Sequence, residues 1–117
     1  MTSNELQLFN MIDNARVNQG CAPLQQDPDL TSSARSDAVS RSKSGSTNST
    51  GSSKTTAGGD EVTAQQAYNQ MMSQSRSTVL NCGLTTLAVG LGTTDHCKIL
   101  LCLTGTAKRY AWVADFE

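Results

Sequence analysis

The sequence predicts a small mixed α and β protein in which three helices are followed by a three-stranded antiparallel meander. Three observations lead to this class. Apolar residues recur at helical spacing in the first part of the chain, and each such stretch begins with a capping signal. From Leu84 onward the apolar period changes to two, which is typical of half-buried strands. A chain of 117 residues suits one core, so we expect a single domain over 1–117.

The first helix is expected to begin at a capping box. Thr2 accepts from an orphan backbone N–H, and Glu5 reaches back to the start of the helix. Gly20 supplies the C-terminal stop. One face is apolar and predicted to be buried; it carries Leu8, Phe9, Ile12 and Ala15.

The second helix is expected to begin at Asp27, with Pro28 in the first position, where its missing N–H costs nothing. Its inner face carries Leu30, Ala34 and Ala38. Beyond about Arg41 the chain consists mainly of Ser, Thr, Gly and Lys. Such a composition buries too little apolar surface to offset the entropy of ordering, so residues 42–59 are predicted to form a flexible loop.

A third helix is expected after Thr63, which forms a second capping box with Gln66. Ala67, Tyr68 and Met71 lie on one side of it, and residues 76–80 add a short helical turn.

Three strands are expected in the last part of the chain. The first contains alternating Leu87, Val89 and Leu91, and residues 93–95 are predicted to form the turn that ends it. Residues 97–104 and 110–116 form the other two strands, with a hairpin connection at 105–108.

The charge balance argues against two classes of partner. Nine Lys and Arg residues face ten Asp and Glu residues, giving a net charge of −1. We therefore expect no nucleic-acid partner and no attraction to an anionic membrane surface. No apolar run approaches the roughly 20 residues of a membrane span, and the longest, Ile99 to Leu103, is predicted to be a buried strand. A monomer is expected.

The cysteines bear on the compartment. Met1 is followed by polar residues, with no basic start and no apolar signal segment. An even set of four cysteines in a small chain favours oxidised pairs and a secreted or cell-envelope protein, so the sequence is interpreted as a mature form with an added Met. The alternative is an intracellular protein with a metal site.

Six blocks of the sequence resemble segments of a known family: residues 12–16, 20–24, 27–31, 76–82, 87–92 and 110–116. They are similar to segments of bacterial CAP/SCP-like domains, relatives of cysteine-rich secretory, antigen five and pathogenesis-related proteins, of a divergent actinobacterial type. The resemblance implies an α/β/α sandwich in which helices flank the antiparallel sheet.

The polar site of that family is not retained here. The family uses two histidines and two acidic residues around a cleft that holds a divalent metal in some members. Asp37 and Ser75 fall at the two histidine positions, and only Asp60 and Glu61 stand near the family's acidic position. We therefore expect no family-type metal cleft and no cofactor. Asp37, Asp60 and Glu61 could instead form a weak cation site, although solvated carboxylates are the commoner outcome.

The resemblance also implies one disulfide. Similar actinobacterial members carry cysteines after the first helix and before the first strand, which pairs Cys21 with Cys82. Cys97 and Cys102 would point to opposite faces of a regular strand, about 16 Å apart. A bend that permits a Cys97–Cys102 bond, a different pairing, or two free thiols remain open.

His96 is the single histidine of the chain. With Cys102 it could be drawn as part of a zinc site, but the spacing fits no established ligand pattern. No nucleophile or orienting acid can be assigned to it from sequence, so general-base catalysis is not favoured.

The leading functional hypothesis is a secreted or cell-envelope, non-catalytic CAP-like module that binds a hydrophobic or envelope ligand, or an envelope or host protein. Some relatives bind sterols or fatty acids, and Met71 and Met72 with Tyr68 could line an apolar groove for a lipid on the third helix, although core packing is the commoner role for residues at this spacing. One alternative is a divergent metal-dependent hydrolase using Asp37, Asp60, Glu61 and His96; another is a purely structural or antigenic surface protein. The candidate ligand-binding residues are Asp37, Asp60, Glu61, Tyr68, Met71 and Ser75.

Overall fold

The structure, a computed structural model, describes residues 1–98 and 102–117. Within these residues it contains three helices and four strands. In chain order they are α1 (Ser3–Asn18), α2 (Pro28–Ser44), β1 (Ser49–Thr50), β2 (Lys54–Asp60), α3 (Ala64–Val79), β3 (Leu87–Cys97) and β4 (Thr106–Phe116). In the described part of the chain, no helix has the length and apolar character needed to cross a membrane.

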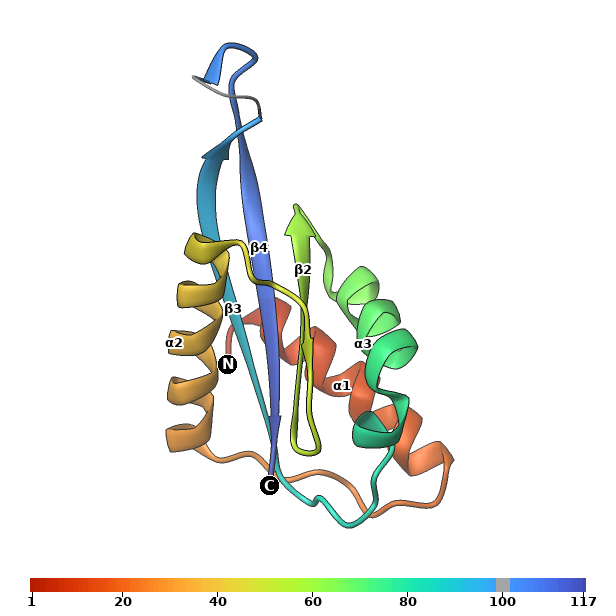
Figure 1. The fold of residues 1–117 in the computed structure, drawn as a ribbon. Coiled ribbons are helices and arrows are strands. Elements are labelled where there is room, and N and C mark those ends of the chain that lie inside the picture. Colours follow the sequence, from red (N-terminus) through yellow and green to blue (C-terminus); the bar gives the residue numbers. More distant parts are fainter. Residues whose placement is uncertain (99–101) are drawn as a thin grey trace.

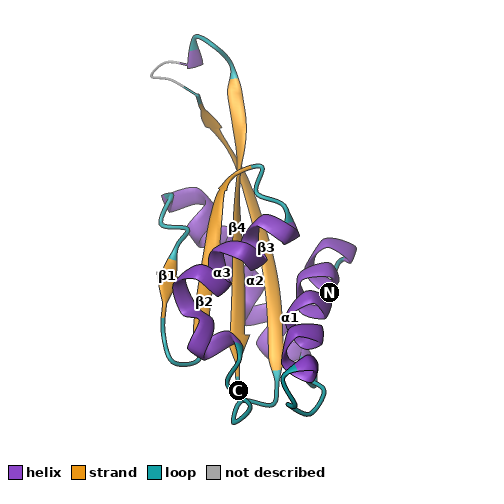
Figure 2. Cartoon of the chain, turned by 90° about the vertical axis from the view of Figure 1, so that its right-hand side faces the viewer, coloured by secondary structure: helices purple, strands orange, loops and turns teal. Residues whose placement is uncertain are grey.

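The elements form three layers. All strand pairs are antiparallel, in the order β1-β2-β4-β3. Helix α2 covers one face of the sheet, while α1 and α3 cover the other (Figures 1 and 2). The mixed fold with helices on both faces is therefore confirmed, but the expected three-stranded sheet is wrong, because the described chain forms four strands.

The helix starts follow the predicted capping chemistry. Thr2 with Glu5 and Thr63 with Gln66 each form a complete capping box. Asp27 accepts from two backbone N–H groups in the first turn of α2. These side chains satisfy donors that the helix itself leaves free, so short polar motifs fix where all three helices begin.

The additional strands lie in the segment expected to be a flexible loop. Residues 42–59 contain the end of α2, all of β1 and most of β2. Thr55, Thr56 and Ala57 are fully buried, and Thr56 pairs with Val113 of β4. Threonine suits a pleated strand, and here the tract gains order through backbone pairing rather than through large apolar side chains. The loop prediction is corrected accordingly.

The predicted turn at 93–95 is also wrong. Strand β3 continues through it and pairs with β4 as far as Cys97, opposite Thr106. The strand expected at 97–104 is not formed as predicted: its middle, 99–101, lies outside the described residues, and Leu103 is 77% exposed. Thr and Asp are compatible with either a turn or a strand, and the pairing with β4 decides between them.

Strands β3 and β4 extend beyond the rest of the sheet as a two-stranded arm. The last pair between β2 and β4 is Asp60 with Arg109. Past it, the β3–β4 arm, defined here as residues 95–98 and 102–108, stands clear of the helices (Figures 1 and 2). The molecule is consequently elongated, with extents of 50 × 27 × 23 Å.

The core is divided by the sheet. The larger cluster lies between the sheet and the α1–α3 layer, and its centre includes Leu8, Ile12, Met71, Val79 and Trp112. The smaller cluster lies under α2 and contains Ala34, Ala38, Ala88 and Val113. Small residues on the α2 side allow that helix to approach the sheet closely.

The outer edge of β3 is covered by a buried carboxylate. Glu5 is 1% exposed and accepts from the Leu91 N–H at 2.9 Å, from the Thr2 N–H at 2.8 Å and from Arg35 at 2.6 and 3.1 Å. Burial would raise the pKa of Glu5, but these hydrogen bonds outweigh it and lower the pKa to about 2. One side chain thus links α1, α2 and the sheet edge.

Gly90→Ala is expected to lower the free energy of unfolding by about 1–3 kcal/mol, because the new methyl group has no space. Its Cβ would lie 2.4 Å from the Ala34 carbonyl carbon and from the Arg35 nitrogen, which are backbone atoms of α2. Urea denaturation measures the change. Gly83→Ala is the control: its Cβ faces only the Asn81 side chain, at 3.1 Å, and a change within about 0.5 kcal/mol is expected. Equal losses in the two variants would contradict the close packing of α2.

Candidate functional site

Asp37 is held in a network of opposite charges. It lies on α2, where its carboxylate accepts from Arg41 at 3.1 Å and from Lys54 at 2.9 Å. The same Lys54 ammonium lies 3.5 Å from Asp115 of β4. Two carboxylates and two cations thus balance one another where α2 meets the sheet.

The pKa directions agree with this balance. Burial acts to raise the pKa of Asp37, but hydrogen bonds from Lys54 and Arg41 lower it overall. Burial raises the pKa of Asp115, and Lys54 offsets the effect only in part. Because both oxygens of Asp37 are occupied, it has little capacity left to bind a cation or activate water.

Asp60 pairs with His96 rather than with the other predicted acidic residues. The Asp60 Oδ1 lies 2.5 Å from His96 Nε2, and His96 Nδ1 lies 3.1 Å from the Cys97 carbonyl oxygen. Glu61, the next residue, has a left-handed backbone with φ of 51° and lines a separate hollow with Tyr110. The described residues contain no group of three or more His, Cys, Asp and Glu side chains that could hold a metal ion.

Ser75 and Met71 face the interior. Ser75 is 6% exposed and has non-helical angles, φ −144° and ψ 40°, at a kink inside α3. Its Oγ has no hydrogen-bond partner among the described residues. Met71 is fully buried in the larger core cluster. The structure therefore does not bring the six predicted ligand-binding residues together in one site.

A polar face of α3, not singled out from the sequence, holds the β1–β2 hairpin. The Gln70 Oε1 accepts from the Gly58 N–H at 3.0 Å. Gln74 donates to the Ser49 carbonyl at 3.2 Å and also to the Thr56 carbonyl. One turn further on, the Thr78 hydroxyl donates to the Gly51 carbonyl oxygen at 2.5 Å. The four-residue spacing of Gln70, Gln74 and Thr78 places them on one side of a helix, and this spacing is the feature of the sequence that could have predicted the polar face.

A shallow groove lies between α1 and α3. It has a volume of about 280 Å³ and includes one predicted residue, Tyr68. Apolar surface comes from Met11 and Ala15 of α1, which sequence reasoning assigned to no site, together with Tyr68. The other lining residues, Asn14, Asn18 and Gln65, are polar and exposed. Because no lining residue is charged, the α1–α3 groove suits an uncharged or largely apolar group.

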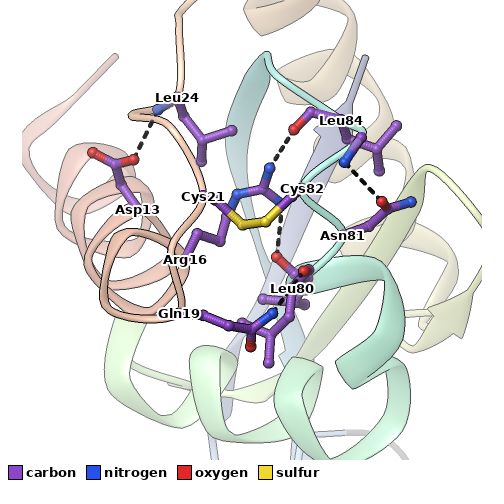
Figure 3. The surroundings of a disulfide bond; sticks show 11 residues. Asp13, Arg16, Gln19, Cys21, Leu24, Leu80, Asn81, Cys82 and Leu84 are labelled. Carbon is purple, nitrogen blue, oxygen red and sulfur yellow. Dashed lines mark hydrogen bonds between the residues drawn. A yellow bond between two sulfur atoms is a disulfide. The ribbon is translucent and has the colours of Figure 1, made fainter.

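The C-terminal ends of α1 and α3 are joined by covalent and polar contacts (Figure 3). Cys21, after α1, is bonded to Cys82, after α3, with an S–S distance of 1.97 Å. Arg16, 1% exposed, donates to the Val79 carbonyl at 2.9 Å and to the Leu84 carbonyl. The structure thus contains the Cys21–Cys82 bond that the resemblance implies, and it fixes the ends of the two groove-forming helices.

The second cysteine pair is also bonded. Cys97 and Cys102 have Cα atoms 4.5 Å apart at the tip of the β3–β4 arm. This distance is far below the roughly 16 Å expected for these positions in a regular strand, so the opposite-face geometry does not apply. Among the described residues there is no free cysteine.

Comparison with known proteins adds information about the fold. The chain matches no protein-family model and no curated protein sequence. Among solved structures it is similar to the crystal structure of MpPR-1i, a pathogenesis-related protein of the CAP superfamily, with a TM-score of 0.70 and 13% identity. The match covers 96% of this chain and 84% of that chain. The CAP-like fold implied by the sequence blocks is therefore confirmed.

Proposed function

Taking the CAP-like fold as the premise, we propose that this chain is a non-catalytic, extracytoplasmic module that binds a hydrophobic ligand in the α1–α3 groove. The observation that carries the proposal is a contrast between the candidate residues Asp37 and Asp60, which are already paired with cations or histidine, and the uncharged groove, which is open. Asp37 is occupied by Arg41 and Lys54, and Asp60 is occupied by His96, whereas the uncharged α1–α3 groove is open to solvent.

The location outside the cytoplasm is supported by the two disulfides. Such bonds persist in oxidising compartments and are rare in the cytosol. The Cys21–Cys82 bond also supports the binding role, because it holds the ends of α1 and α3 together. A groove whose walls are fixed loses less conformational entropy when a ligand enters.

The ligand chemistry follows from the lining. Met11 and Tyr68 offer an adaptable apolar chain and an aromatic ring, which together suit an acyl chain or a flat apolar skeleton. The exposed amide side chains of Asn14, Asn18 and Gln65 also line the groove and can hydrogen-bond a polar head group. An amphipathic lipid with one polar end is therefore the preferred class.

Oleate is expected to raise the melting temperature, and Ala15→Glu is expected to weaken oleate binding at least tenfold. The substitution places a charge and added volume inside the groove. At free oleate about 100 times the Kd, binding to the native state stabilises it by about 3 kcal/mol. Isothermal titration and thermal denaturation measure the two effects.

Val17→Glu is the matched control, because Val17 lies on the same helix, is 43% exposed and is not part of the groove. It should bind oleate as the unmodified chain does. Equal binding by Ala15→Glu, or no stabilisation by oleate, would refute the groove assignment. Stabilisation by Zn²⁺ or Ca²⁺ that Asp60→Asn abolishes would favour a metal-dependent protein instead.

A further inference from the structure

The surroundings of the Cys97–Cys102 bond differ from those of the Cys21–Cys82 bond, which is called the body disulfide below. Cys97 is the last residue of β3 and is exposed, as are its neighbour Lys98 and, at 77%, Leu103. The bond lies at the tip of the β3–β4 arm, which stands clear of the helices (Figure 2). Because Cys97 is exposed, we expect a dissolved thiol to reach its sulfur.

Among the described residues, the contacts of the two tip cysteines are confined to the arm: Cys97 pairs with Thr106 of β4, and its carbonyl oxygen lies 3.1 Å from His96 Nδ1. The local backbone bonds run from the Lys98 N–H to the Gly105 carbonyl, 3.2 Å, and from the Gly105 N–H to the Cys102 carbonyl, 3.0 Å. Cys102 has a φ of 57°, a left-handed conformation that is unfavourable for a residue with a side chain. Opening the bond lets Cys102 leave this conformation.

The body disulfide has the opposite setting. Cys21 is only 7% exposed, and the bond joins the ends of two helices that share the larger core cluster. Arg16 and Gln19 tie the same region together through hydrogen bonds to the Val79 and Leu80 carbonyls. The packed fold keeps the two sulfur atoms adjacent even after reduction, which favours re-formation of this bond.

We propose that the Cys97–Cys102 bond is a site of reversible thiol–disulfide exchange with a small thiol of the glutathione class. The thiolate attacks the exposed Cys97 Sγ and forms a mixed disulfide there. The bond between the two protein sulfurs breaks, and its electron pair leaves on Cys102 Sγ, which takes a proton from water. Attack by the Cys102 thiolate on the mixed disulfide reverses the step, so no separate oxidant is consumed.

Graded concentrations of reduced glutathione, followed by alkylation and tandem mass spectrometry, test the proposal on the intact chain. Cys97 and Cys102 are expected to be modified at a thiol concentration at least tenfold below that needed for Cys21 and Cys82. At the same concentration the melting curve should still show one cooperative transition. The glutathione adduct is expected on Cys97 in preference to Cys102.

Two variants sharpen the result. Incubated with oxidised glutathione, Cys102→Ala should accumulate a stable glutathione adduct on Cys97, with one reduced glutathione released, because no resolving thiol remains. Under the same conditions Cys97→Ala should accumulate less adduct on the half-buried Cys102. Modification of Cys21 and Cys82 before or together with the tip pair would overturn the proposal, as would preferential adduct formation on Cys102. Oleate binding is measured in parallel; the arm lies apart from the α1–α3 groove, so failure of either proposal leaves the other standing.

Discussion

Glu5→Gln is expected to lower the free energy of unfolding by about 3 kcal/mol at pH 7. The substitution keeps the shape of the side chain but removes the charge that Arg35 and the Leu91 and Thr2 N–H groups stabilise. The magnitude follows from the folded pKa of about 2 against the ordinary 4.5, since one pKa unit corresponds to about 1.4 kcal/mol. Urea denaturation at several pH values measures it.

The direction of the Glu5 pKa shift determines how the loss of unfolding free energy in Glu5→Gln depends on pH. Because the folded pKa of Glu5 lies below its ordinary value, its contribution is complete above 4.5 and is lost as the pH falls through about 2. The difference between the original chain and Glu5→Gln should therefore shrink over that interval. Asp95→Asn, which alters an exposed carboxylate on the arm, should show no comparable change. If the loss of unfolding free energy in Glu5→Gln stayed constant as the pH fell through that interval, the assigned hydrogen bonds would be contradicted.

Removal of the body disulfide by Cys21→Ala with Cys82→Ala is expected to cost about 4 kcal/mol. The bond spans 61 residues, and a cross-link of that length removes much of the conformational freedom of the unfolded chain. Denaturant unfolding of the double variant under non-reducing conditions measures the loss. A domain of this size has only about 5–15 kcal/mol of total stability, so the effect should also appear as a large fall in melting temperature.

The tip pair provides the internal comparison. Cys97→Ala with Cys102→Ala opens a bond that spans five residues, and the same relation gives a cost of about 2 kcal/mol or less. If the two double variants lost equal stability, the assignment of Cys21–Cys82 as the main covalent support of the body would be wrong.

The helices were predictable because their signals are local. A capping box needs only two side chains three residues apart and the backbone beside them. Thr63 with Gln66 therefore predicts the start of α3 without reference to the rest of the fold. Strand β2 lacks such a signal. Its Thr, Ala and Gly residues are indistinguishable from a mobile tract until β4 supplies the partner for Thr55 and Thr56. The extent of β3 through Asp95 depends on the same distant partner.

The contacts of the candidate residues were beyond prediction for a related reason. The neutralisation of Asp37 requires Lys54, 17 residues away, and the pairing of Asp60 with His96 spans 36 residues. Tyr68 was identified from its position on α3, but Met11 and Ala15 became groove residues only when α1 was placed beside that helix. Residue type was readable from the sequence, whereas proximity was set by tertiary packing.

The elongated outline created by the β3–β4 arm affects how the molecule rotates in water. Its long dimension of 50 Å is about twice the other two, so reorientation about the long axis is faster than reorientation of that axis itself. Helix α2 runs along the strands (Figure 1), which aligns its N–H bonds with the slow axis, whereas the ladder N–H bonds of β3 and β4 are perpendicular to it. Amides in α2 and in the sheet therefore experience different effective correlation times within one rigid body. Differences in nuclear relaxation between these elements arise from molecular shape before any internal motion is invoked.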